Sequence, residues 1–344
     1  MNQPSASAPS RFAQLLARAG LDWFLLALIG VVALAYFQPG LGSKTSFMPW
    51  KLITTVGVAM VFFFYGLKLS FEKLRAGMRN WQLHTLVQLA TFVLFPALAL
   101  LVHPFFGAER GELLWQSIFF LCALPSTVST SVVMVSIAGG NLPAAIFNAS
   151  ISSLLGILLT PLLCSIFLHT SADSSHLWGL ALQLLWQVVL PVGAGVALNA
   201  HFGPWVERHR TGLRIFDQVT ILLIVFTAFC DSFAEGIFSR YLPADVLKLG
   251  AGMVVLYLLA FGIIWAMSRV LNFTRPDQIV AVFCGSKKSL VHGSVMASLL
   301  FPASAIGLIL LPLMLYHSLQ IVLASSMAQY LGRQTVIETT IVTA

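Results

Sequence analysis

One stretch of this chain, Gly285-Ser286-Lys287-Lys288-Ser289-Leu290-Val291-His292-Gly293, decides its fold because it lies inside an otherwise apolar segment. Two adjacent lysines placed in hydrocarbon cost roughly 2.5–3.5 kcal/mol each on insertion. The flanking glycines and serines favour a helix that breaks here and turns its polar backbone toward a cavity. An interrupted, charged span in the middle of a bilayer predicts a site for a transported solute or ion.

The composition indicates an integral membrane protein. Hydrophobic residues make up 58% of the chain and charged residues only 9%, whereas a soluble domain carries about 25% charged residues. The run 113–172 contains no Asp, Glu, Lys or Arg, and a bilayer crossing needs about 20 apolar residues, so this run must turn back at least once. No connecting segment is long enough to hold a soluble domain.

The sequence predicts ten membrane spans with both termini in the cytoplasm. We place them at 21–38, 50–68, 82–102, 113–137, 142–168, 178–199, 214–234, 248–269, 276–301 and 303–331. Twelve Lys and Arg residues then fall on the side of the N-terminal segment 1–20 and five on the other side. This bias follows the positive-inside rule. The net charge of +7 therefore reflects membrane topology, and we expect no nucleic-acid partner.

Ten spans divide into two repeats of five, 21–168 and 178–331. An odd number of spans per repeat inverts the second repeat, and such repeats place discontinuous helices at matching positions. The fourth span carries Pro125-Ser126-Thr127-Val128-Ser129-Thr130-Ser131, where proline and hydroxyl groups favour a break. The lysine stretch occupies the equivalent ninth span. An ordinary proline kink is the alternative interpretation of the fourth span.

The candidate site combines polar residues of both breaks with polar residues of the third and fifth spans. These are Ser126, Thr127, Thr130, Ser131, Ser286, Lys287, Lys288, Ser289 and His292, together with Gln88, Asn148 and Ser152. Asn148 and Ser152 share a helix face and could bind a cation or a polar solute, but hydroxyl and amide groups also mediate helix packing in membranes. For Gln88, a role in helix packing is an equally good interpretation. For His292, the alternative to a site residue is an interior histidine whose hydrogen bonds are satisfied within the protein. No acidic residue lies deep in any span to neutralise the lysines.

Several segments together resemble the bile acid:sodium symporter family, in particular its bacterial branch, which includes the divergent orphan vertebrate member. They are Phe63-Phe64-Tyr65-Gly66-Leu67-Lys68-Leu69-Ser70, Cys122 to Ser131, Gly140-Asn141 with Asn148-Ala149-Ser150, Leu159-Thr160-Pro161-Leu162-Leu163, and Phe283 to Leu290. The resemblance implies the fold of bile acid symporters and NhaA-like proteins, which is all-α and polytopic, with ten transmembrane helices in two inverted repeats. It implies a core of 82–168 plus 248–331, a panel of 21–70 plus 178–235, and crossing of the broken fourth and ninth helices. It also implies a multi-pass protein of the bacterial inner membrane.

The chain departs from the sodium-coupled members of that family. These members use a glutamate and a glutamine in the ninth-helix break, whereas Cys284-Gly285-Ser286-Lys287-Lys288 contains no carboxylate. Sodium could still bind at Thr130, Ser131 and Asn148, since hard cations prefer oxygen ligands, but a nearby ammonium would repel it. A lysine could instead occupy the place of the cation, release a proton during the cycle, or attract an anionic solute. We expect no cofactor other than sodium or protons as the coupling ion.

The function expected from these features is secondary active transport of a small organic, anionic solute by alternating access. A non-transporting regulator or scaffold that keeps the transporter fold is an alternative. An intramembrane enzyme needs a nucleophile with a base, or a metal cluster; Ser289 beside Lys288 is the nearest approach to such a pair. Cysteines 122, 164, 230 and 284 lack metal-ligand spacing, and we interpret them as buried small hydrophobes. Neither the identity of the solute nor the oligomeric state follows from the sequence.

Overall fold

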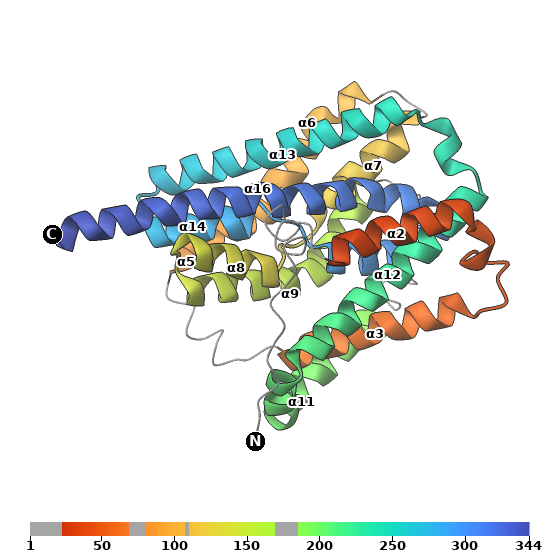
Figure 1. Cartoon of the computed structure of the whole chain (residues 1–344), viewed down its shortest axis with the longest axis horizontal. Coiled ribbons are helices and arrows are strands. Elements are labelled where there is room, and N and C mark those ends of the chain that lie inside the picture. Colours follow the sequence, from red (N-terminus) through yellow and green to blue (C-terminus); the bar gives the residue numbers. More distant parts are fainter. Residues whose placement is uncertain (1–22, 69–79, 107–109, 169–184, 344) are drawn as a thin grey trace, which may run out of the picture.

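The computed structural model describes residues 23–68, 80–106, 110–168 and 185–343, and these residues form an all-helical protein without strands (Figure 1). Six of the described helices are long and apolar enough to cross a membrane. They are Trp50–Lys68, Trp81–Phe105, Leu142–Phe167, Arg210–Ala234, Pro243–Val270 and Ala303–Arg333. The expected multi-pass helical architecture is therefore confirmed. The start of the predicted sixth span, 178–184, lies outside the described residues.

The described part of the first half contains the 15-residue helix α2, two full-length helices, one helix with a π turn and one interrupted helix. Its elements are α2 (Trp23–Phe37), η1 (Pro39–Leu41), α3 (Trp50–Lys68), α5 (Trp81–Leu89), η2 (a π turn, Ala90–Leu94), α6 (Phe95–Val102), η3 (His103–Phe105), α7 (Arg110–Ala123), α8 (Ser129–Ala138) and α9 (Leu142–Phe167). Helices α5 and α6 are one continuous span, because the π turn between them keeps helical backbone angles at both ends.

The described part of the second half also contains long helices and one interrupted helix. Its elements are η4 (a π turn, Leu185–Val189), α11 (Leu190–Arg208), α12 (Arg210–Ala234), η5 (Ile237–Arg240), α13 (Pro243–Val270), α14 (Arg275–Gly285), α15 (Leu290–Leu300) and α16 (Ala303–Thr343). Helices α11, α12 and α13 each begin or end beyond the span expected from hydropathy, because their polar terminal turns continue the helix.

Two helices in the described part of the chain are interrupted, and the two interruptions are in contact. The first separates α7 from α8, where Pro125 has no N–H to continue the helix and Leu124 N–H bonds to Leu121 O at 3.2 Å. The second separates α14 from α15. Ser289 N–H in the second break donates to Pro125 O in the first at 2.9 Å. This backbone bond joins segments that are 164 residues apart in the chain.

A polar network joins the N-terminal ends of three helices, α5 and α9 from the first half and α14 from the second. Asp277 in the first turn of α14 accepts hydrogen bonds from Asn80 Nδ2 and Asn141 Nδ2, each at 3.0 Å. The two asparagines also cap α5 and α9 through their side-chain oxygens. Gly139 makes the turn before α9 with a positive φ of 76°, which suits glycine. We call this side of the molecule the Asp277 end; it lies at the left of Figure 1.

Helices α3 and α11 cross at very short range. A Cβ on Gly66 would overlap Val192 O, and a Cβ on Gly195 would overlap Phe63 O. Small residues that allow close backbone approach are typical of helix packing in membranes. Helix α12 packs against α2, α3 and α16, and so connects the α3–α11 pair to the rest of the molecule.

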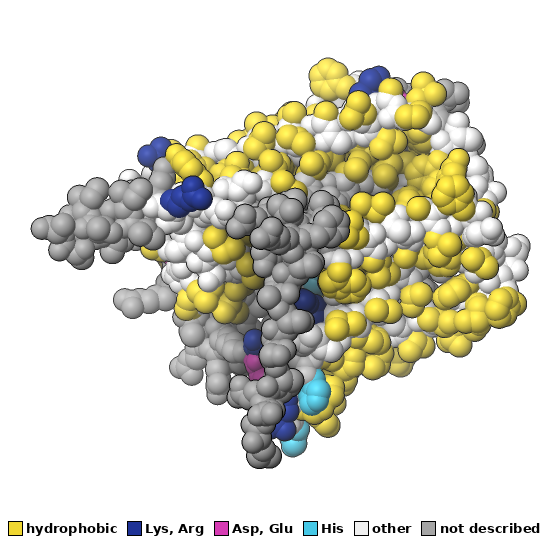
Figure 2. All heavy atoms as spheres, in the orientation of Figure 1, with side chains coloured by type: hydrophobic (Ala, Val, Ile, Leu, Met, Phe, Trp, Pro, Cys, Tyr) yellow, Lys and Arg dark blue, Asp and Glu magenta, His cyan; other side chains and the backbone are white. Residues whose placement is uncertain are grey.

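Apolar side chains cover much of the described surface. Figure 2 shows hydrophobic side chains (yellow) over most of the visible face, with Lys and Arg (dark blue) confined to a few places. Large apolar residues are strongly exposed, among them Phe37 at 74% and Phe105 at 85%. This surface suits contact with lipid rather than with water.

Candidate functional site

Several carbonyls at the end of α7 and in the break after it lack the usual donors four residues ahead, and other groups take the place of those donors. Ala123 O accepts from Thr160 Oγ1 at 2.8 Å, and Pro125 O accepts from Ser289 N–H. Cys122 O would normally bond to Ser126 N–H, but that group donates to Ser152 Oγ at 3.0 Å instead. Cys122 O and Leu124 O therefore need a donor from elsewhere, because buried carbonyls are almost always paired.

The side chain of Lys288 provides that donor. Its Nζ lies 2.7 Å from Cys122 O and 2.8 Å from Leu124 O, and 2.9 Å from Thr91 O. An ammonium group has three N–H donors, so three carbonyls match its full complement. The ring of Phe95 lies 4.2 Å from Nζ and adds a cation–π contact. Lys288 is fully buried, and its charge is thus surrounded by backbone oxygens and one aromatic face.

Thr91 O is available because of the π turn. Phe95 N–H bonds to Ala90 O rather than to Thr91 O. In a π register the next donor for Thr91 O would be residue 96, which is Pro96 and has no N–H. The local sequence around the π turn therefore leaves one carbonyl free, and Lys288 binds it.

The backbone of the second break is held by α16. Gln320 Oε1 accepts from Lys288 N–H and Gln320 Nε2 donates to Lys288 O, both at 2.9 Å. Tyr316 OH donates to Ser286 O at 2.6 Å, and Ser286 Oγ donates back to Val282 O at 2.6 Å. Because the amide of Gln320 pairs with both backbone groups of Lys288, it fixes the direction in which the lysine side chain leaves the break.

Lys287 points to the other interrupted helix. Its Nζ donates to Thr130 O in the first turn of α8 at 2.9 Å. Beside it the hydroxyls of Thr127, Thr130 and Ser131 form a cluster, with Thr127 Oγ1 lying 2.7 Å from Thr130 Oγ1 and 2.9 Å from Ser131 Oγ. The two lysines thus leave the break toward different helices, Lys287 toward α8 and Lys288 toward α7.

The amide pair Gln88 and Asn148 lies at the α5–α9 contact. Gln88 Nε2 donates to Asn148 O at 3.3 Å and to Asn148 Oδ1 at 3.4 Å, and Asn148 Nδ2 donates to Ala144 O at 3.0 Å. Gln88 Oε1 and Ser126 Oγ are buried and have no hydrogen-bond partner among the described residues. These oxygens can accept or share a hydrogen bond from a polar ligand.

His292 faces the α3 helix across a small cavity. Its Nδ1 lies 3.1 Å from Ser289 Oγ, while its Nε2 is buried without a partner in the described part of the chain. The rings of Phe62 and Tyr65 pack edge-on against it, with centroids 6.1 Å and 5.4 Å away. The cavity, of about 40 Å³, continues from His292 to the Lys68–Asp217 ion pair.

A much larger cavity, of about 600 Å³, opens at the opposite end of the molecule. Residues of α3, α12, α15 and α16 line it, and Lys44, Lys51, Thr54, Asp231 and Ser298 are among its polar members. We call this side the Lys44 end. Lys51 has no carboxylate within ion-pair distance among the described residues.

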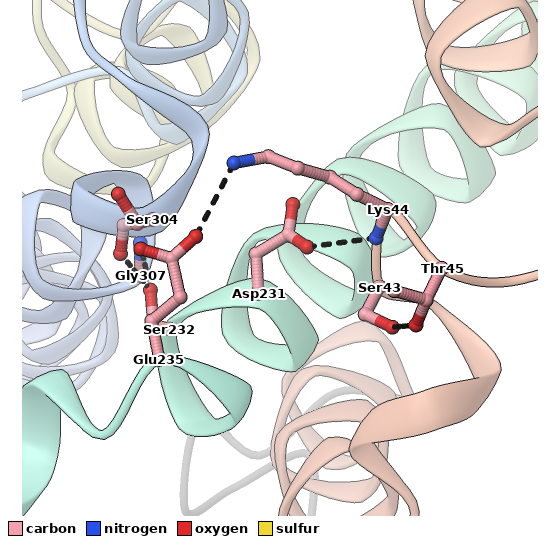
Figure 3. Close-up of polar contacts among 8 residues, drawn as sticks. All are labelled: Ser43, Lys44, Thr45, Asp231, Ser232, Glu235, Ser304 and Gly307. Carbon is pink, nitrogen blue, oxygen red and sulfur yellow. Dashed lines mark hydrogen bonds and ion pairs between the residues drawn. The ribbon is translucent and has the colours of Figure 1, made fainter.

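Polar contacts between the segment before α3 and helix α12 form part of one wall of this cavity (Figure 3). The backbone N–H of Lys44 donates to Asp231 Oδ1 at 3.0 Å, and Lys44 Nζ lies 3.2 Å from Glu235 Oε1. Next to it Ser232 Oγ, on α12, donates to Ser304 O and accepts from Gly307 N–H on α16 at 3.1 Å. Asp231 is therefore a buried acceptor rather than a solvated helix end.

The sodium ligands considered from the sequence are only partly brought together. Thr130 and Ser131 share a hydroxyl cluster, but no hydrogen bond among the described residues joins Asn148 to it. Lys287 Nζ already bonds to Thr130 O, and an ammonium at that distance opposes a second cation. The described residues contain no group of three His, Cys, Asp or Glu side chains able to hold a metal.

Sequence reasoning missed four residues that complete the site: Thr91, Phe95, Tyr316 and Gln320. Gln320 carried a usable signal, since it is a lone amide within an apolar run in the same way as Gln88. Thr91 contributes only its backbone, and its role depends on the π turn before Pro96. A carbonyl carries no side-chain signature, so this contact could not be read from the residue itself.

Comparison with known proteins gives a consistent answer. The model of the SBF-like CPA transporter family matches residues 22–333. An uncharacterized protein of Pseudomonas aeruginosa is 41% identical over 91% of this chain and 93% of its own length. YfeH of Escherichia coli, provisionally named a symporter, is 38% identical over 92% and 94%. Sodium/bile acid cotransporter 7 of Xenopus tropicalis is 32% identical over 90% and 92%.

Proposed function

Because the chain belongs to the SBF-like CPA transporter family, we propose that it is a secondary active transporter of a small organic anion. The family and its named relatives are transporters rather than enzymes, and the resemblance inferred from the sequence is thereby confirmed.

The observation that carries the proposal is the position of Lys288. Its ammonium binds carbonyls of two different helical spans, Thr91 O beside α5 and Cys122 O and Leu124 O at the end of α7. In transporters, unwound backbone carbonyls at helix breaks coordinate the coupling cation. We infer that the Lys288 ammonium takes the place of such a cation. The contact of the two breaks would then be held together without sodium.

This arrangement supports protons as the coupling ion. Neutral lysine has two N–H donors instead of three, so loss of the proton would leave one of the three carbonyls without a donor. An unpaired buried carbonyl costs about 1–3 kcal/mol, and the contact between the breaks would loosen. Deprotonation of Lys288 is therefore proposed as the step that releases one conformation and favours the next.

The order of elements supports ten spans in two inverted repeats. In each half, the fourth span is the interrupted one, α7–α8 and α14–α15, and one long helix follows it, α9 and α16. We propose that the core comprises 82–168 and 248–331 and the panel 21–70 and 178–235. The close α3–α11 crossing at Gly66 and Gly195 supports the panel as a rigid unit.

The two cavities support alternating access between these units. Both lie where α3 or α12 meets α15, and they differ in size, about 600 Å³ at the Lys44 end against about 40 Å³ beside His292. We propose that the solute enters at the Lys44 end, which the positive-inside rule assigns to the outside of the bacterial inner membrane. Both termini would be cytoplasmic.

The polar lining supports an anionic solute. Lys51 at the large cavity lacks a carboxylate partner among the described residues. Thr55 lines the same cavity, and its hydroxyl can donate to a carboxylate or sulfonate. The hydroxyls of Thr54 and Ser298 donate to Trp50 O and Val295 O, and their oxygens face the cavity as acceptors. Apolar neighbours such as Phe301 would contact the body of the solute.

Proteoliposomes containing the purified protein test this proposal. A panel of organic carboxylates and sulfonates, with amines as controls, is added under an inward proton gradient, and uptake is measured with sodium or potassium outside. We expect saturable uptake of at least one anion that depends on the proton gradient and is lost in Lys288→Ala. Absence of saturable uptake of every solute would support a non-transporting regulator and contradict the proposal.

A further inference from the structure

An apolar cavity of about 780 Å³ lies between α6, α7 and α13. Leu98, Val102, Ile118, Leu249, Met253 and Leu256 are among its lining residues. Such a volume is within the range of small-molecule sites, roughly 300–1,000 Å³. Its walls offer very few polar partners, and water needs two to four of them to occupy a buried site. The natural occupant is therefore an apolar chain.

The cavity opens sideways, toward the apolar surface of the protein. On its α13 side Val255 is 62% and Leu259 47% exposed, and on its α6 side Leu101 is 69% exposed. These residues belong to helices that are apolar enough to span a membrane. The opening is thus accessible from the hydrocarbon of the bilayer, and a lipid chain can enter it without crossing water.

A basic residue stands at the rim at the depth of lipid headgroups. Helix α13 has 28 residues, which is about 42 Å at 1.5 Å per residue, whereas the hydrocarbon core is about 30 Å thick. Its first turns therefore reach the headgroup region. Lys248 lies there, lines the rim and is 79% exposed, and its Nζ is 3.9 Å from Asp245 Oδ1.

We propose that this cavity binds a glycerophospholipid, with one acyl chain between α6, α7 and α13 and the phosphate beside Lys248. The apolar walls match the chain, and the ammonium of Lys248 complements the phosphate charge. Asp245 Oδ2 accepts from Leu242 N–H at 3.0 Å, and the Asp245 side chain is less exposed than that of Lys248, so Lys248 is the group that faces the headgroup. The deep end of the cavity is formed by Cys122, whose carbonyl binds Lys288. A bound chain would therefore pack against the same turn of α7 that holds the ammonium.

Gly252 allows a direct test. It lines the cavity, and a Cβ built on it meets no atom within 4 Å, so a side chain can start there, and Gly252→Phe is the variant chosen to fill the cavity. Gly262, on the same helix and outside the cavity, is equally open. Gly262→Phe is therefore the matched control, and Gly252→Leu is a smaller variant of the same test.

The experiment is native mass spectrometry of the purified full-length protein titrated with dioleoylphosphatidylethanolamine. We expect one tightly held phospholipid on the wild type and on Gly262→Phe, at least tenfold weaker binding on Gly252→Phe and Gly252→Leu, and weaker binding on Lys248→Gln. The same lipid should raise the melting temperature of the wild type but not of Gly252→Phe. Equal lipid retention by Gly252→Phe and Gly262→Phe would overturn the proposal. The proposal would also be overturned if the wild type retained only detergent. The same holds if the wild type were a dimer that Gly252→Phe converts to a monomer, because a second copy would then occupy the cavity.

Discussion

The ammonium nitrogen of Lys288 lies 2.7 Å from the carbonyl oxygen of Cys122, across the contact between the two interrupted helices. That carbonyl is free because Ser126 N–H bonds to Ser152 Oγ instead of continuing α7. One proline-induced break thus creates the acceptors, and the other break delivers the donor. The site is a consequence of how two helices end rather than of a cluster of acidic ligands.

The two lysines should differ in their effect on stability. Lys288→Ala leaves three buried carbonyls without their donor, at about 1–3 kcal/mol each, while Lys287→Ala removes a single bond to Thr130 O. We expect Lys288→Ala to lower the melting temperature in detergent by clearly more than Lys287→Ala. Equal effects, or a larger one at Lys287, would argue against the role assigned to the Lys288 ammonium.

Gln320 should be needed to direct the Lys288 side chain. Gln320→Leu removes the two hydrogen bonds with the Lys288 backbone, a loss of about 2 kcal/mol if each contributes about 1 kcal/mol. The control is Gln329→Leu on the same helix, since Gln329 is exposed. Thermal unfolding of both variants should show a loss for Gln320→Leu and almost none for Gln329→Leu. An equal response of the two would mean that the amide has no such role.

The α3–α11 crossing should tolerate no added methyl group. In Gly66→Ala the new Cβ overlaps Val192 O, and overpacking of this kind costs about 1–3 kcal/mol. Gly193→Ala is the matched control, because a Cβ there meets nothing within 4 Å. We expect a reduced yield of folded protein and a lower melting temperature for Gly66→Ala only, measured by size-exclusion chromatography and thermal unfolding. Wild-type behaviour of Gly66→Ala would show that the helices do not pack this closely.

The Asp277 network should contribute to stability through its two acceptor oxygens. Asp277→Asn keeps one oxygen and turns the other into a donor, so Asn80 or Asn141 loses its acceptor. A loss of about 1–3 kcal/mol is expected, against a smaller one for Asp245→Asn at the exposed start of α13. Chemical denaturation of the two variants checks this difference. If Asp277→Asn is the milder change, the network does not hold the three helix ends together.

Much of this arrangement could be predicted from the sequence, because composition and breaks carry strong physical signals. A continuous apolar helix is unfavourable at the paired lysines and at Pro125 with its neighbouring hydroxyls. The structure interrupts both helices at these places. The direction of each lysine could not be predicted. It depends on which carbonyls lack donors, and that follows from a π turn before Pro96 and from Ser152 on another helix. Contacts between distant backbone groups leave no pattern in the residues that make them.

The most direct test of whether Lys288 replaces a coupling cation is the melting temperature of the purified wild type as sodium replaces potassium at constant ionic strength. A ligand at 100 times its dissociation constant stabilises the native state by about 2.7 kcal/mol, so a bound sodium ion would be readily detected. If the Lys288 ammonium occupies the place of the cation, the wild type should be indifferent to sodium across the titration. A saturable rise in melting temperature with sodium would show that a cation site persists beside the lysines and would contradict the account.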